Sequence, residues 1–147
     1  MHVSSRMPGH LIRRLHQLST QVFLQRVREA GFDLTPVQFA ALDALRHSPG
    51  IDQAGLAQAI AKDRATVGAV ADRLAQKGLV TRIVSDRDKR SRELALTEAG
   101  EATVTAILPV VERLQKEILP GLDEAEYAAF VALARKAVRA AQASGRE

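Results

Sequence analysis

The chain has 147 residues, no cysteine and a formal net charge of +4. Its length suits one domain with a real hydrophobic core, and its 46% hydrophobic and 26% charged residues are ordinary for a soluble folded protein. The lack of cysteine excludes disulfides, thiolate metal sites and thiol redox switches. No apolar run approaches the roughly 18–20 residues of a membrane span, and residues 1–10 carry no secretory signal. We therefore expect a cytoplasmic protein that does not contact the membrane.

Helix signals divide the first half of the chain into four segments. A helix over 8–31 begins at Pro8, and its apolar residues recur at helical spacing, as Leu11, Leu15, Leu18 and Val22. A second helix begins with the capping box Thr35-Pro36-Val37-Gln38 and ends before Pro49-Gly50. Asp52 and Asp63 are expected to cap two further short helices, and Gly78 ends the second of these.

The second half is predicted to be a hairpin followed by two long helices. Residues 79–84 and 92–96 are predicted strands, joined by the loop 85–91. Thr97 caps a helix that ends at Pro120-Gly121, and Pro109 within it predicts a bend or a local break. A second capping pattern over 122–127 opens a last helix that ends near Ala143. The expected fold is mainly α with a small β-hairpin, in the order ααααββαα.

Basic charge is concentrated between Lys62 and Arg92. Residues 62–77 contribute +2 and residues 82–92 contribute +3, so this window holds +5 while all other residues sum to −1. Basic charge gathered on a helix and an adjoining hairpin is typical of nucleic-acid binding. Aromatic residues make up only 3%, which disfavours a protein that stacks single-stranded bases. Duplex DNA is the expected partner.

The two short helices, joined by about three residues, fit a helix-turn-helix, whose second helix lies in the major groove. The candidate DNA contacts on this second helix are Arg64, Thr66, Val67 and Arg73. Arginine suits bidentate contact to guanine, and threonine suits a hydroxyl contact or the thymine methyl. The alternative is an alanine-rich helical hairpin whose charges are merely solvated.

The loop of the hairpin strengthens the DNA-binding interpretation. Arg87, Lys89 and Arg90 are candidate contacts, because an arginine at the tip of such a ribbon can enter the narrow minor groove. Asp88 would hold a neighbouring arginine in place through a charge-assisted hydrogen bond. The alternative is a solvated charged turn. With this hairpin as the wing, the predicted architecture is a winged helix-turn-helix.

A set of linked motifs resembles the MarR family of bacterial transcriptional regulators. The motifs are Asp72-Arg73-Leu74, Lys77-Gly78-Leu79-Val80-Thr81-Arg82, Asp88-Lys89-Arg90 and Leu96-Thr97-Glu98-Ala99-Gly100. Lys89 stands where the family more often has arginine. The resemblance implies a single MarR-type domain over 1–147 that forms an obligate homodimer. Residues 8–31 and 98–143 would be the dimerisation helices, and 35–97 the winged lobe.

The dimer is also expected from the sequence itself, because one small chain could hardly cover the broad apolar stripes of its three long helices. A twofold dimer would bind a pseudopalindromic operator with half-sites roughly 34–36 Å apart.

The opening Pro8-Gly9-His10-Leu11-Ile12-Arg13-Arg14, together with Leu34-Thr35-Pro36-Val37-Gln38, is similar to a branch of the family that responds to small aromatic acids. A polar stripe runs along the first helix at spacings i, i+3, i+4, i+7 and i+11, as His10, Arg13, Arg14, Gln17 and Gln21. Since the family places its effector beside this helix, the candidate ligand contacts are His10, Arg13, Arg14 and Gln17, with Gln38. Arg13 or Arg14 would clamp the carboxylate. The alternative is a solvated helix face, with Gln38 a cap and His47 a surface residue.

No catalytic spacing, phosphate loop or metal-binding histidine pair is present in the sequence, so no enzyme and no cofactor is expected. We interpret the chain as a repressor released by a small aromatic carboxylate. The alternative is a winged-helix DNA-binding dimer that is controlled by a partner protein and has no small-molecule effector.

Overall fold

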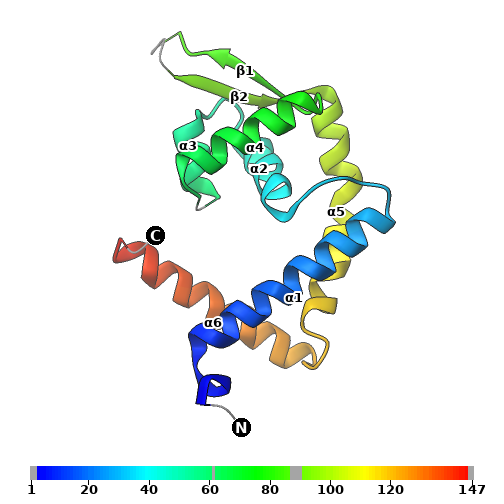
Figure 1. Ribbon diagram of the computed structural model, residues 1–147, viewed down its shortest axis with the longest axis vertical. Coiled ribbons are helices and arrows are strands. Elements are labelled where there is room, and N and C mark those ends of the chain that lie inside the picture. The colour runs from blue at the N-terminus through cyan, green and yellow to red at the C-terminus, as the bar shows by residue number, and fades with distance from the viewer. Residues whose placement is uncertain (1–2, 61, 87–90, 146–147) are drawn as a thin grey trace.

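A computed structural model of the chain describes residues 3–60, 62–86 and 91–145 (Figure 1). Within these ranges the elements are η1 (Val3–Arg6), α1 (Pro8–Glu29), α2 (Pro36–His47), α3 (Gln53–Ala59), α4 (Arg64–Gln76), β1 (Val80–Val84), β2 (Arg92–Leu96), α5 (Glu98–Ile118) and α6 (Glu124–Ala143). The predicted order of four helices, a hairpin and two helices is confirmed. None of the described helices is long and apolar enough to cross a membrane.

Side-chain caps fix where α2 to α6 start, whereas α1 starts at Pro8 without one. Thr35 Oγ1 accepts the Gln38 backbone N–H at 3.1 Å, and Gln38 Oε1 accepts the Thr35 N–H at 3.2 Å, which is the predicted capping box. Asp123 and Glu126 form the same reciprocal pair at the start of α6. Such caps satisfy amide groups that have no partner inside the helix. The predicted helix starts are therefore confirmed, because each depends on residues within one turn.

One half of the molecule is a lobe built from α2, α3, α4 and the antiparallel pair β1–β2, in which Val80 pairs with Leu96 and Val84 with Arg92. The segment before α3 pairs with the other side of β2 through an isolated antiparallel bridge between Asp52 and Glu93. Gly50 N–H donates to the Leu94 carbonyl at 3.0 Å, and Leu94 N–H donates to the Ile51 carbonyl at 2.8 Å. The core of the lobe is filled by fully buried side chains from every layer, including Leu42, Leu45, Leu56, Val67, Leu74 and Leu94.

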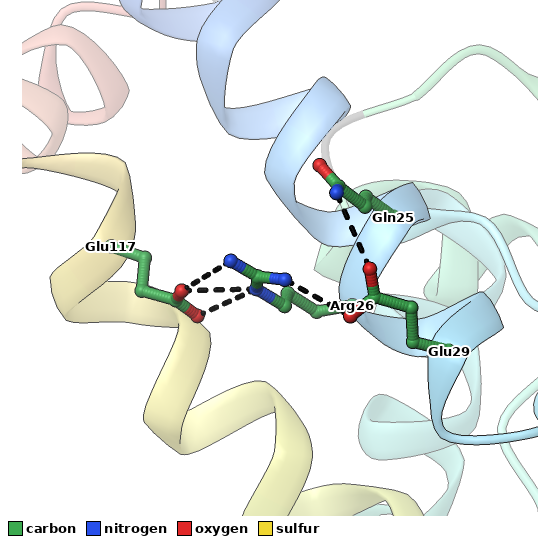
Figure 2. Close-up of polar contacts among 4 residues, drawn as sticks. All are labelled: Gln25, Arg26, Glu29 and Glu117. Atoms are coloured by element: carbon green, nitrogen blue, oxygen red, sulfur yellow. Dashed lines mark hydrogen bonds and ion pairs between the residues drawn. The ribbon is translucent and has the colours of Figure 1, made fainter.

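The other half of the molecule is an arm in which α1 packs across the distal part of α5 (Figure 1). Phe23 and Val27 of α1 are buried, as are Val111 and Leu114 of α5. Polar contacts add to this packing: Arg26 Nε donates to Glu117 Oε1 at 2.9 Å, and Arg26 Nη1 donates to Glu29 Oε2 at 2.9 Å (Figure 2). Because these ion pairs are exposed, we expect them to orient the two helices more than to stabilise the fold.

The helix α5 continues without interruption from Glu98 to Ile118, so the predicted local break at Pro109 is not formed. Proline removes one backbone hydrogen bond within a helix. Here Ile107 and Val111 are buried on either side of Pro109, and Pro109 itself is exposed. Packing of the flanking apolar residues holds the helix together where the local backbone preference opposes it.

The start of α5 is fastened to the turn between α4 and β1. Thr97 N–H donates to the Leu79 carbonyl at 3.0 Å, and Thr97 Oγ1 donates to the Gly78 carbonyl at 2.7 Å. Gly100 is buried against the same turn, and a Cβ placed on it would lie 2.1 Å from the Leu79 carbonyl oxygen. The glycine in this motif is therefore required by close approach of two backbones.

We predict that Gly100→Ala lowers the free energy of unfolding by about 1–3 kcal/mol, because the added methyl group forces α5 away from Leu79. Urea unfolding followed by circular dichroism measures the change. Gly121→Ala is the matched control, since a Cβ at Gly121 meets nothing within 4 Å. Equal stabilities for the two variants would contradict the close-approach explanation.

Candidate nucleic-acid interface

The helix α4 presents one face to solvent and buries the other. Val67, Ala71 and Leu74 are buried in the core, whereas Arg64 and Arg73 are exposed. Arg64 is the first residue of α4, at the end that carries the positive pole of the helix dipole. The structure therefore leaves both predicted arginines accessible to DNA.

The prediction of Val67 as a DNA contact is wrong, because its side chain is 0% exposed and belongs to the core of the lobe. Val67 starts the stripe that continues at i+4 and i+7 with Ala71 and Leu74. Its apolar role and a base contact exclude each other, since one helix face cannot point into the core and into a groove.

Thr66 lies in the first turn of α4 and takes part in the cap of that helix. Its backbone N–H and its Oγ1 donate to the two carboxylate oxygens of Asp63, at 2.8 and 2.9 Å. These two hydrogen bonds are the main reason that the pKa of Asp63 lies below its ordinary value. The hydroxyl proton is therefore directed at Asp63, while the hydroxyl oxygen keeps its acceptor capacity and the methyl group remains.

Two of the basic residues counted in the charged window hold the lobe together. Arg82 of β1 is paired with Asp72 of α4. Lys77 Nζ donates to the Asp33 carbonyl and to Gln38 Oε1, the latter at 3.3 Å, which ties the end of α4 to the start of α2. These contacts use the charges of Arg82 and Lys77 to position α4. The positive charge available to bind DNA is therefore smaller than the net charge of the window.

The hairpin lies beside α4 at the end of the molecule far from α1 and α6 (Figure 1). The base of its loop is closed by a backbone hydrogen bond from Ser85 N–H to the Ser91 carbonyl at 3.1 Å. The predicted wing residues Arg87, Asp88, Lys89 and Arg90 lie outside the described residues. Their place in the sequence, between Asp86 and Ser91, connects them to this base.

One residue at this base has a second role that the sequence analysis missed. Asp52 caps α3 by accepting the Gly55 N–H at Oδ1, 2.7 Å away, and it also accepts the Ser91 hydroxyl at Oδ2, 3.1 Å away. Hydrogen bonds from Gly55 and then from Ser91 lower the pKa of Asp52. The cap could be recognised from local sequence, but the partner at position 91 could not.

The polar stripe on α1 forms and is exposed along most of its length. Arg13 Nη2 lies 3.0 Å from His10 Nδ1, and Arg14 Nη1 donates to Gln17 Oε1 at 3.4 Å. Arg14, Gln17 and Gln21 line an open hollow of about 650 Å³ along the helix. The structure thus pairs His10 with Arg13 and Arg14 with Gln17.

Gln38 is not brought to this stripe by any contact of its side chain. Its amide oxygen accepts from Thr35 N–H and from Lys77 Nζ, so the capping box and the α2–α4 link account for it. His47 Nδ1 lies 2.8 Å from the Asp43 carbonyl oxygen, one turn earlier on the same helix. Across the described ranges, no group of three or more histidine, aspartate or glutamate side chains is arranged to hold a metal ion.

Comparison with known proteins agrees with this geometry. Residues 32–91, which include α2, α3, α4 and the hairpin, match the model of the MarR family. The chain is also 32% identical to the HTH-type transcriptional repressor NicR of Pseudomonas putida, over 93% of this chain and 85% of that protein. The chain belongs to the MarR family. It is a DNA-binding transcriptional regulator of winged-helix fold and not an enzyme.

Two solved structures of this family are similar along almost the whole chain. One is described as showing regulation of DNA binding of Bordetella bronchiseptica BpsR by 6-hydroxynicotinic acid. It has a TM-score of 0.84 and 33% identity, and the match covers 94% of this chain and 96% of that one. The other is the PcaV regulator of Streptomyces coelicolor with its natural ligand. It has a TM-score of 0.84 and 30% identity, with 96% and 98% covered.

The lowered pKa of Asp52 predicts a dependence of stability on pH. Because folding depresses this pKa, the stabilising contribution is complete above the ordinary aspartate value of about 3.9 and is lost as the pH falls from there through the folded pKa. Asn at position 52 keeps a helix cap but does not titrate. We expect the unfolding free energy of the wild type to fall more between pH 7 and 3 than that of Asp52→Asn, measured by urea unfolding across this range. Parallel pH profiles would contradict the prediction.

Proposed function

We propose that two copies of the chain form a homodimer that represses transcription at a pseudopalindromic operator and leaves the DNA when a small aromatic carboxylate binds. The observation that carries this proposal is that two different surfaces lie at opposite ends of the molecule. Exposed arginines of α4 and the base of a basic hairpin lie at one end, and long helices with uncovered apolar faces lie at the other.

The proposed DNA contacts are Arg64, Thr66 and Arg73 from α4 and Arg87, Lys89 and Arg90 from the wing, with Asp88 as support. Arg64 and Arg73 are exposed on a helix whose opposite side is anchored in the core, so they can reach a groove without rearrangement of the lobe. Thr66 lies in the same first turn as Arg64. A recognition helix meets base edges with its N-terminal residues, which is where Arg64 and Thr66 stand.

The proposed dimer rests on apolar surface that one chain leaves uncovered. α6 has no buried residue, and its Phe130, Val131, Leu133 and Val138 are 36% to 66% exposed. Leu11, Ile12 and Leu18 of α1 are also exposed. Apolar area of this extent on long helices is typical of an interface between subunits. A second copy would cover it, so that residues 8–31 and 98–143 would form the dimerisation helices. The winged lobe, residues 35–97, would remain free for DNA.

The proposed effector is a planar carboxylate held by α1. NicR is named as a repressor, and BpsR is regulated by 6-hydroxynicotinic acid, an aromatic carboxylic acid. In this chain the guanidinium group of Arg13 lies beside His10, and that of Arg14 lies beside Gln17. Arg14 and Gln17 also line the hollow on α1. A guanidinium binds a carboxylate through two parallel hydrogen bonds. The alternative, control by a partner protein without an effector, has no comparable feature among the described residues.

We predict that DNA affinity falls steeply with salt and that Arg64→Ala weakens it by roughly 5- to 100-fold, as expected for an arginine that contacts bases. The probe is a duplex enriched by the wild-type protein from random-sequence DNA, called here the selected duplex, and affinity is measured by fluorescence anisotropy. Arg113→Ala removes the same charge from an exposed position on α5 and is the control. Equal losses for the two variants, or a salt-independent affinity, would refute the assignment of α4.

We predict that the double variant Arg13→Ala, Arg14→Ala responds to aromatic acid at a concentration at least about 30-fold higher than the wild type, because a carboxylate loses its paired cation. Release of the selected duplex is titrated with 6-hydroxynicotinic acid and a panel of hydroxybenzoates. Arg28→Ala, near the opposite end of α1, is the matched control. DNA affinity without acid should be unchanged in both variants. Release of the double variant at the wild-type concentration would remove these arginines from the site.

If no acid in the panel releases the DNA or raises the melting temperature of the wild type, the partner-controlled alternative is favoured. A ligand that prefers the folded dimer must raise its apparent stability. The thermal shift therefore separates the two proposals without use of DNA.

A further inference from the structure

The carboxylate of Asp52 joins two parts of the lobe that are separate in the sequence, the start of α3 and the hairpin. Its Oδ1 caps α3 through Gly55, and its Oδ2 receives the hydroxyl of Ser91, the first described residue after the basic segment of the hairpin. Its backbone forms an isolated antiparallel bridge with Glu93 of β2. Each carboxylate oxygen therefore has a different partner, one in the helix-turn-helix and one in the hairpin.

The charge of Arg64, at the start of α4, also acts on this carboxylate. After the hydrogen bonds from Gly55 and Ser91, the positive charge of Arg64 is a further cause that lowers the pKa of Asp52. Arg64 is the exposed first residue of α4, so the electric field of Asp52 acts on a proposed DNA contact.

The junction is also held by Ile51, which packs on the core, and by the backbone hydrogen bonds of Gly50 and Ile51 with Leu94. It lies beside a hollow of about 470 Å³ whose lining includes Asp52, Ser85, Ser91 and Glu93. Ser85 is only 6% exposed, and its N–H closes the hairpin base on the Ser91 carbonyl. The hydrogen bond from Ser91 to Asp52 extends this junction from β2 to the loop end of the hairpin.

We propose that Asp52, through Ser91, is a positioning residue that holds the loop end of the hairpin against the start of α3, the first helix of the helix-turn-helix. The inference rests on the proposed DNA-binding surface and deepens it. Asp52 itself contacts no DNA in this scheme. A carboxylate beside a DNA-binding surface repels phosphates, so removal of its charge alone would strengthen binding. Positioning predicts the opposite sign, which makes the two explanations separable.

The test uses three variants of the full chain and the selected duplex. Ser91→Ala deletes the hydroxyl without a change of charge. Asp52→Ser keeps a good cap for α3 but offers one oxygen, which Gly55 engages, so Ser91 loses its acceptor. The third variant combines both. We expect each single variant to bind about 5- to 10-fold more weakly than the wild type, and the double variant to bind no more weakly than either, because all three lose the same hydrogen bond.

Two further variants control for charge and for stability. Asp86→Asn removes an exposed carboxylate from the same hairpin and should leave affinity equal to or above that of the wild type. Ser91→Thr retains a hydroxyl and should restore binding. Melting temperatures are measured for all variants, and the affinity of Ser91→Ala should fall while its melting temperature stays near that of the wild type.

The outcomes separate this inference from the function on which it rests. Binding by Asp52→Ser that equals or exceeds that of the wild type would show that Asp52 only repels DNA, and losses that multiply in the double variant would show that Ser91 contacts DNA independently. Either result overturns the inference and leaves the DNA-binding function intact. Failure of the wild type to bind any duplex in a salt-dependent manner would refute the proposed function instead.

Discussion

Packing along α5 is the interaction on which the rest of the structure depends. Its buried stripe includes Val104 and Ile107, toward the DNA-binding lobe, and Val111 and Leu114, toward α1. One continuous helix therefore belongs to two hydrophobic contacts at once, and its rigidity sets how the lobe stands on the arm. Arg26 and Glu117 form a polar contact between α1 and α5, and Gly100 permits the close approach of α5 to Leu79 in the lobe. In a dimer, any movement of α1 against α5 would be transmitted to the lobe by this helix.

Charge in the lobe is distributed between holding the structure and facing DNA. Arg82 and Lys77 are engaged with Asp72 and with groups at the start of α2, so their contribution is to fix α4 in place. Arg64 and Arg73 stay exposed. Acidic residues in a basic region are not surplus: Asp63 and Asp52 cap the two helices of the helix-turn-helix, and both have lowered pKa values because hydrogen bonds favour their charged forms.

The arm shows the opposite arrangement, in which apolar surface is left unsatisfied. α6 forms a full helix with a capping box and yet has no fully buried residue within its own chain. A helix of that kind gains little from propensity alone, since most helical stability in proteins comes from burial of one face. Its sequence makes sense when a second copy supplies the missing contact. The same argument applies to the exposed apolar residues near the start of α1, beside the polar stripe proposed to hold the effector.

The sequence by itself determined the order and starts of the elements, because caps such as Thr35 and Asp123 and the apolar periodicity act within one or two helical turns. It also located the basic window and the exposed Arg64 and Arg73. The apolar stripe of Val67, Ala71 and Leu74 also marks Val67 as a core position. Tertiary structure alone decided that packing carries α5 through Pro109. It likewise decided that Gln38 accepts a hydrogen bond from Lys77 and that Asp52 accepts one from Ser91. The physical reason is distance along the chain: Gln38 and Asp52 each lie 39 residues from these partners, α5 packs on α1 from still further away, and no local pattern specifies which residues the fold will bring together.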